Sequence, residues 1–311
     1  MIEGQEGVSW DEWVALARAC EDHGLEGLFR SDHYGSTVAG EARDALDAWT
    51  TLAALAPLTS RIRLGTLVSP ATFRHPSVLA KCALAVDHAS RGRAEVGMGA
   101  GWMEYEHRAF GLPFLDGSTR LELLAEQVEI VHRLLTDEAV SFAGKHYRLE
   151  DARPRPAPVQ EPRPPIIVGG SARSGTLRPA VRFADEYNTT FPTVEEAADR
   201  RRRLDVACAA GGRDPKTLPL SMMTGCVVGR DAAEVRDRLR RRAERSGVDE
   251  PPEEYGEKRG DSLVIGTVEE AAGRLRAYES AGVERVMLQH LDHADLDMVA
   301  LIGDELVPAV A

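Results

Sequence analysis

The chain has 311 residues, with 50 acidic against 38 basic side chains and a formal net charge of −12. This acidic balance excludes a general nucleic-acid or membrane-surface binder and favours a small-molecule ligand. No apolar run is long enough to span a bilayer, no secretory leader is recognisable and the four cysteines form no Cys-x-x-Cys pair, so we expect a cytoplasmic protein without structural zinc or disulfides.

Apolar periodicity alternates between helix and strand along most of the chain. A first helix is expected over 10–23, where Ser9 and Glu12 form a capping box, and a later one opens on a second box at Thr267 and Glu270. Arg-rich runs at 200–203 and 240–242 are expected on solvated helix faces. The other expected helices lie near 45–55, 76–89, 120–135, 176–183, 194–210 and 232–246, with a last one after residue 289.

Seven short, buried-type strands are expected between these helices, which predicts parallel βα units. They lie over 25–29, 62–67, 94–96, 166–168, 186–189, 218–228 and 285–289. A closed (β/α)8 barrel needs eight strands, and the shortfall is at the front, where Met1 and Ile2 are the only stub. We therefore expect a single α/β domain over 1–311, a (β/α)8 TIM barrel whose first strand is missing or truncated. Residues 137–165 are predicted to form a surface excursion from it.

Glycines or small polar residues follow four of the predicted strands, at 31–34, 65–70, 97–101 and 169–175. Because the carboxyl ends of parallel barrel strands meet on one face, these segments are expected to build a single site. Asp32 and His33 stand at the first of these ends. Elsewhere in a protein, a turn-capping Asp beside a hydrogen-bonded core His is the commoner fate of such a pair, but the position at a strand end favours a functional role. No further ligand lies at a metal-binding spacing, so no metal site is predicted.

The two glycine-rich segments carry different weight. In the run from Gly97 to Gly101, the lack of bulk lets backbone N–H groups approach an anion or a flat ring, but a tight βα turn without any ligand explains the pattern equally well. The run from Gly169 to Thr176 follows a strand and precedes a helix, which is the usual arrangement of a barrel phosphate site. Arg173 within it either pairs with a phosphate or is simply exposed.

The order and spacing of several motifs resemble those of the bacterial luciferase-like family, and within it most closely the branch that uses the deazaflavin coenzyme F420. The resemblance covers nearly the whole chain. The motifs that carry it are the segments 24–33, 64–66, 74–76, 96–102, 110–111, 147–150, 164–170, 184–188 and 282–288.

This resemblance implies a barrel that holds a flavin-like ring at the carboxyl ends of its strands. It implies that Asp32 contacts the deazaflavin, that His33 donates a proton to the substrate, and that a cis peptide bond between Leu67 and Val68 props one face of the ring. The remaining contacts that it implies line the ring or hold the phosphate, and they come from Gly97, Met98, Gly99, Ala100 and Gly101, and from Gly170, Ser171, Ala172, Arg173, Gly175 and Thr176.

Two positions depart from relatives that oxidise sugar phosphates, because Ala100 stands where those carry a carboxylate base and Met103 where an Asn is common. That substrate class is therefore not expected. The expected function is hydride transfer between coenzyme F420 and a small organic substrate. Its pocket is expected from Tyr34, Trp102, Met103, Phe110 and the excursion at 142–147, although these side chains suit ordinary core or loop packing equally well. The alternatives are an FMN-dependent monooxygenase that uses reduced flavin and O2, and a non-catalytic flavin-binding protein. Relatives are often dimers, which makes a homodimer the expected assembly if one forms.

Overall fold

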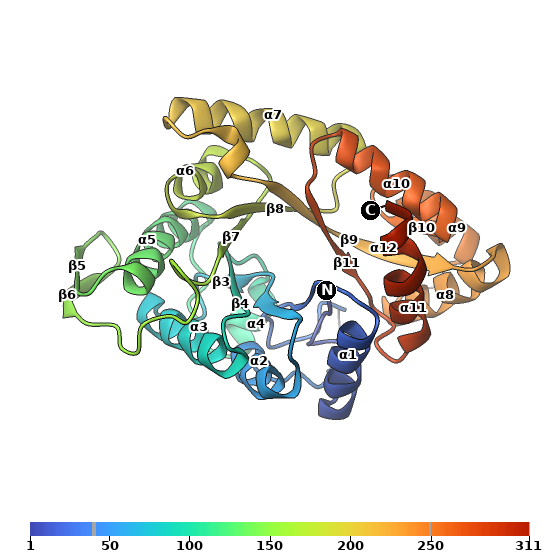
Figure 1. Cartoon of the computed structure of the whole chain (residues 1–311), viewed down its shortest axis with the longest axis horizontal. Coiled ribbons are helices and arrows are strands. Elements are labelled where there is room, and N and C mark those ends of the chain that lie inside the picture. Colours follow the sequence, from blue (N-terminus) through green and yellow to red (C-terminus); the bar gives the residue numbers. More distant parts are fainter. Residues whose placement is uncertain (39–41, 249, 311) are drawn as a thin grey trace.

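Parallel strands surrounded by helices form the centre of the computed structural model, which describes residues 1–38, 42–248 and 250–310 (Figure 1). The strands follow the order β1-β2-β4-β7-β8-β9, and β9 then pairs with both β10 and β11. Their bounds are β1 (Gly27–Arg30), β2 (Arg63–Thr66), β3 (Ser69–Pro70), β4 (Ala94–Gly99), β7 (Ile166–Gly169), β8 (Glu186–Thr190), β9 (Leu220–Gly229), β10 (Val264–Thr267) and β11 (Arg285–Gln289). All seven predicted core strands are present, so the α/β class and the barrel arrangement are confirmed.

Helices follow the strands along the chain and cover the outside of the sheet (Figure 1). Both predicted capping boxes form, at the starts of the first and tenth helices. The helices are α1 (Trp10–Asp22), α2 (Ala48–Leu55), α3 (Pro76–Ser90), α4 (Glu104–Ala109), α5 (Gly117–Thr136), α6 (Ser174–Phe183), α7 (Val194–Ala210), α8 (Ala232–Arg245), α9 (Pro252–Arg259), α10 (Val268–Ser280), α11 (Leu296–Leu301) and α12 (Val307–Val310), with short turns η1 (Ala56–Leu58), η2 (Pro215–Thr217) and η3 (Ile302–Leu306). Within the described ranges, no helix has the length and apolarity needed to cross a membrane.

An antiparallel hairpin projects from the barrel between α5 and β7, at the left edge of Figure 1. Its strands are β5 (Val140–Ala143) and β6 (Arg148–Ala152). Apolar residues of the hairpin pack with α3 and α5 in a small cluster of their own, which includes Val140, Ile130 and Ala80. The hairpin therefore covers helices rather than extending the barrel sheet.

Several short elements differ from the expectation. The stretch expected to be a polar loop contains α9 and β10, and α4 was not expected at all. Both helices have eight residues or fewer and β10 has only four, too short to display a periodicity. The expected solvation of 240–242 is wrong for Arg242, which is 5% exposed and donates to the side-chain oxygen of Gln289 at 2.9 Å.

Met1 and Ile2 occupy the place between the first and last barrel strands. Ile2 donates its N–H to Phe29 O of β1 at 2.9 Å, and on the other side the N–H of His290 donates to Met1 O at 2.9 Å. The Met1 ammonium also donates to Leu288 O of β11 at 2.9 Å. Among the described residues β1 and β11 are not paired directly, so this stub, which the sequence predicted, joins them at their carboxyl ends.

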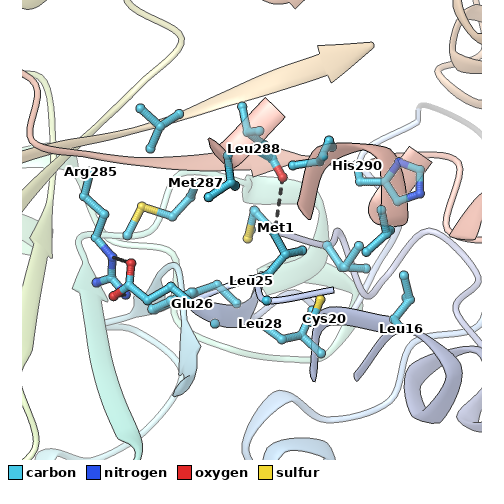
Figure 2. Close-up of a pocket in the computed structure, with 18 residues that line it drawn as sticks. Met1, Leu16, Cys20, Leu25, Glu26, Leu28, Arg285, Met287, Leu288 and His290 are labelled. Carbon is cyan, nitrogen blue, oxygen red and sulfur yellow. Dashed lines mark hydrogen bonds and ion pairs between the residues drawn. The ribbon is translucent and has the colours of Figure 1, made fainter. Parts of the chain in front are cut away.

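A cavity of about 300 Å³ lies between β1 and β11, and Met1 and Ile2 form part of its lining (Figure 2). Arg285 and Glu26 form an ion pair at one end of it, and the imidazole of His290 stands at the other. The walls between them are mostly apolar and come from β1, β11, α1 and α11.

The amino-terminal end of the barrel is filled by ion pairs. Arg285, the first residue of β11, contacts Glu95 of β4 at 2.8 Å and Glu186 of β8 at 3.0 Å. Arg63 of β2 also pairs with Glu95. Next to this layer, the barrel interior contains the apolar side chains of Phe29, Leu67, Ile167, Met223 and Met287. The buried amide of Asn188 also lies there and donates to Ser221 Oγ at 2.9 Å. Polar groups that are open to a ligand therefore have to lie at the carboxyl-terminal end.

Candidate active site

The carboxyl ends of β2, β4 and β7 meet at the side chain of Val68. A Cβ atom built on Gly97 or on Gly169 would lie 3.2 and 3.1 Å from Val68 Cγ1, and one on Gly99 would overlap Val68 Cγ2. The peptide bond between Leu67 and Val68 is cis, as the resemblance implied. Three of the four segments that were expected to share one site are therefore in contact at this point.

Asp32, in the fourth segment after β1, contacts the turn that contains Val68. Its carboxyl group is 1% exposed, and its Oδ2 atom accepts hydrogen bonds from Ser69 Oγ at 2.6 Å and from Arg74 at 2.5 Å. The Oδ1 atom is buried and has no hydrogen-bond partner among the described residues. Because a buried carboxylate oxygen without a donor is costly, this atom marks a position where a bound group can donate a hydrogen bond.

Arg74 fixes a positive charge beside Asp32. Its guanidinium lies between Asp32 and Asp47, the residue that caps the start of α2. Burial by itself would lower the pKa of Arg74, but the charges of Asp32 and Asp47 outweigh burial and raise it. The buried guanidinium of Arg30 lies near the same two carboxyl groups, whose charges oppose the lowering of its pKa to about 10 by burial. Two carboxyl groups and two guanidinium groups therefore share this part of the site.

His33 is paired with a carboxyl group from α4. Its Nδ1 atom lies 2.7 Å from Oε1 of Glu106, which is 0% exposed. The other oxygen of Glu106 accepts the N–H of Tyr34 at 2.9 Å. Burial alone would lower the pKa of His33, but the hydrogen bond and the charge of Glu106 outweigh it and raise the pKa above its ordinary value.

Aromatic side chains surround His33 and Tyr34 at the rim of the barrel. The indole of Trp102, 65% exposed, lies edge-on to the His33 ring with 5.7 Å between the centroids. Tyr34 stacks on Phe73 at 4.7 Å and lies 5.5 Å from Phe110. Three of the residues expected to form the substrate pocket are therefore gathered here.

The remaining members of the expected pocket are placed differently. Met103 is buried, and its carbonyl lies 2.7 Å from Nδ1 of His107. Tyr147 packs edge-on against His75, the residue that caps the start of α3, and its hydroxyl accepts from Gln127 at 2.9 Å. The structure thus places the hairpin side of the expected pocket against α3 and α5.

The first glycine-rich segment is strand rather than loop over most of its length, which corrects the expectation. Gly97, Met98 and Gly99 belong to β4, and Met98 is in the hydrophobic core. A Cβ on Gly97 would overlap the carbonyl oxygen of Thr66 in β2, so the absence of a side chain there serves strand packing. Ala100 and Gly101 follow the strand, and Gly101 has a φ of 79° that favours glycine.

The second glycine-rich segment forms the turn into α6. Ala172 has a φ of 53° and donates its N–H to the hydroxyl of Tyr187 at 2.8 Å, and that hydroxyl also lies 2.7 Å from Oγ1 of Thr176. Ser171 and Arg173 are exposed. In the part of the chain that the structure describes, α6 begins without a side-chain cap. The N–H of Thr176 donates to Arg173 O at 3.0 Å, which leaves the N–H groups of Ser174 and Gly175 available to an anion.

Packing accounts for two other positions in this turn. A Cβ on Gly170 would come within 2.6 Å of both Thr176 Oγ1 and the Tyr187 hydroxyl, and one on Gly175 would lie 2.7 Å from Leu121 of α5. The expected phosphate loop is therefore a tightly packed backbone turn, whose exposed groups are the side chains of Ser171 and Arg173 and the first N–H groups of α6.

Arg74, Glu106 and Tyr187 are site residues that sequence reasoning missed. Arg74 and Tyr187 lie within motifs of the family resemblance, which was the available signal for them. Glu106 is 73 positions from His33, on a six-residue helix, so no spacing pattern connects the two.

The fold and this site define a parallel βα barrel with a candidate ligand site at the carboxyl ends of its strands. Residues 2–285 match the family model described as luciferase-like monooxygenase. The uncharacterised protein Rv0953c of Mycobacterium tuberculosis is 32% identical over 246 residues, which cover 74% of this chain and 83% of that protein. The chain belongs to the luciferase-like monooxygenase family, whose members are oxidoreductases and monooxygenases.

Two solved structures illustrate how closely the fold is shared. An F420-dependent secondary alcohol dehydrogenase in complex with an F420–acetone adduct is similar with a TM-score of 0.83 and 20% identity, over 98% of this chain and 96% of that one. The oxygenating constituent of 3,6-diketocamphane monooxygenase from Pseudomonas putida, in complex with FMN, is similar with a TM-score of 0.76 and 16% identity, over 97% and 93%.

Proposed function

We propose that the protein is an oxidoreductase that transfers a hydride between coenzyme F420 and a small organic substrate. The observation that carries this proposal is the buried, unpartnered Oδ1 atom of Asp32, which lies next to His33 at the position that the family resemblance assigns to deazaflavin contact. The reduced deazaflavin ring supplies the hydride when it is bound. The F420-dependent alcohol dehydrogenase of the same fold supports this choice of coenzyme.

The residues of the chain bind the coenzyme and supply the proton. Asp32 accepts a hydrogen bond from the coenzyme, and Arg74 holds this carboxyl group in place. The turn into α6 binds the coenzyme phosphate through the N–H groups of Ser174 and Gly175 at the start of the helix. His33 donates the proton that accompanies the hydride, because it is held beside the coenzyme site and its pKa is raised.

FMN is the second candidate, with a monooxygenase reaction that uses reduced flavin and O2. The uncapped start of α6 favours it as much as F420, because both coenzymes carry a phosphate. The FMN-bound monooxygenase of the same fold gives this alternative its support. Asp32 separates the two, because an FMN site is expected to tolerate the loss of this carboxyl group.

Parallel fluorescence titrations with F420 and FMN test the assignment. We expect F420 to bind at least about tenfold more tightly than FMN, and Asp32→Ala to weaken F420 binding by about tenfold or more, which is about 1.4 kcal/mol. Asp237→Ala, at an exposed position of α8, is the control and should bind as the wild type does. Tighter binding of FMN would replace the proposal by the monooxygenase, and unchanged F420 binding by a folded Asp32→Ala variant would contradict the role of Asp32.

A further inference from the structure

We propose that Glu106 is the positioning residue of the proton donor: it fixes the ring of His33 and confines proton transfer to the Nε2 atom. This inference rests on the proposed role of His33 as the donor. It concerns a carboxyl group that reaches the site from a helix outside the barrel sheet, at a position different from Ala100, where sugar-phosphate oxidising relatives carry their base.

Both carboxyl oxygens of Glu106 are engaged in hydrogen bonds at the site. Its two carboxyl oxygens contact consecutive residues of the loop after β1, the Nδ1 atom of His33 at 2.7 Å and the N–H of Tyr34 at 2.9 Å. Glu106 is fully buried, so water does not compete for either bond. Both the ring and the backbone that carries it are therefore held by one side chain.

This contact determines which ring nitrogen exchanges protons. A carboxylate accepts hydrogen bonds, so Nδ1 of His33 keeps its hydrogen in both the neutral and the charged ring. The Nε2 atom makes no hydrogen bond to any of the residues that the structure describes. It therefore carries the proton that can leave, and the His33 side chain keeps an exposure of 12% through which a substrate can reach it.

Three acidic groups face His33 from different elements. Glu106 comes from α4, Asp32 from the end of β1 and Glu3 from the segment after the Met1–Ile2 stub, and each opposes the effect of burial on the ring. Asp32 is paired with Arg74, and Glu3 accepts from Gln289 at 2.7 Å. Glu106 is in direct contact with the ring and is expected to dominate its titration.

The proton balance in the reducing direction follows from this arrangement. A hydride adds to one atom of a polarised double bond of the substrate, and the Nε2–H bond of the His33 imidazolium breaks as its proton passes to the other atom. The neutral ring that results keeps its Nδ1–H bond to Glu106 and takes a new proton at Nε2 from solvent. Glu106 orients the ring and takes no part in the proton exchange, as the carboxylate partner of a catalytic histidine does.

The first test is an NMR titration of the histidine ring in the protein without coenzyme, with the His33 signal assigned by its loss in His33→Gln. In Glu106→Gln, the pKa of His33 should move to lower pH, whereas Glu106→Asp should keep part of the elevation. Glu104→Gln, on an exposed position of the same helix, is the matched control and should titrate as the wild type. An unchanged His33 titration in Glu106→Gln would overturn the inference.

The second test is the pH dependence of F420-linked reduction in the same variants. Glu106→Gln should lower kcat by about tenfold to a hundredfold at neutral pH and displace the alkaline limb of the profile to lower pH, with F420 affinity unchanged. A uniform loss at every pH, or a loss that Glu106→Asp does not partly rescue, would show a merely structural role and contradict the inference. Absence of F420 binding in the wild type would instead refute the proposed function, whereas the NMR titration tests the effect of Glu106 on His33 without it.

Discussion

Three buried titratable side chains near the carboxyl end of the barrel differ in the partners they have. Asp32 has a guanidinium partner, and His33 has a carboxyl partner. His290 is 4% exposed, and neither of its ring nitrogens has a hydrogen-bond partner among the described residues. Burial lowers the pKa of His290 to about 4, so this ring is neutral in the folded protein at neutral pH.

We expect His290 to make the protein less stable as the pH falls from about 6.5 toward 4. In this window the unfolded chain binds a proton at His290 and the folded chain does not, which costs about 2 kcal/mol by pH 5. Urea unfolding of the wild type and of His290→Phe at pH 7, 6 and 5 measures this loss of stability. His88→Gln, at an exposed position, is the control. Stability curves of wild type and His290→Phe that stay parallel over this range would contradict the expectation.

At the scale of elements, β4 shows how a glycine pattern that suggests ligand binding serves strand packing instead. Gly97 faces the backbone of β2, and Gly99 faces Val68 in the turn that follows β2. The backbone oxygen of Thr66 cannot turn away as a flexible side chain can. A side chain at position 97 therefore has to push two barrel strands apart.

Gly97→Ala is expected to destabilise the protein by about 2 kcal/mol or more, because the added methyl group overlaps the Thr66 carbonyl. Gly273→Ala is the matched control. Gly273 lies within α10 with no atom within 4 Å of the added methyl, so the change should stabilise by about 0.5–1 kcal/mol. Thermal and urea unfolding measure the change in stability of each variant. Equal effects of the two substitutions would disprove the packing role of Gly97.

Longer elements could be predicted from local patterns, whereas short ones could not. The predicted bounds of α7 and β11 agree with the structure residue for residue. The α4 helix has six residues, and Met103 before it provides no side-chain cap, so no local signal marked it. Glu106 lies on this helix. Its contact with His33 was therefore missed because α4 itself was not predicted.

At the scale of the whole molecule, the two ends of the barrel have opposite characters. The amino end is closed by Arg285 and the carboxylates around it, while the carboxyl end carries Asp32, His33 and the uncapped start of α6. Burial raises the pKa of Glu186 despite the charge of Arg285. Arg63 pairs with Glu95 but not with Glu186, so Arg285 is the only cation in contact with Glu186 among the described residues.

Arg285→Met should destabilise the protein by about 3–5 kcal/mol at pH 7, because it leaves the buried Glu186 without a cation and Glu95 with Arg63 alone. The loss should shrink at pH 5.5, since the pKa of Glu186 is already raised and a buried carboxyl group relieves its penalty by taking up a proton as the pH falls. Urea unfolding at both pH values measures this. Arg202→Met, at an exposed ion pair, should change stability by less than about 1 kcal/mol. A loss for Arg285→Met that is equally small would refute the account.

By itself the sequence determined the alternation of helices and strands, the capping boxes and the placement of Asp32 and His33 at a strand end, because periodicity and caps act over a few neighbouring residues. Only the tertiary structure decided that Arg74 holds Asp32, that Glu106 clamps His33 and that Gly97 packs against β2. These contacts join segments brought together by the pairing of barrel strands and the docking of helices on them. The two residues of each contact are far apart in the sequence. The contacts therefore form only when the barrel is assembled, and no local pattern predicts them.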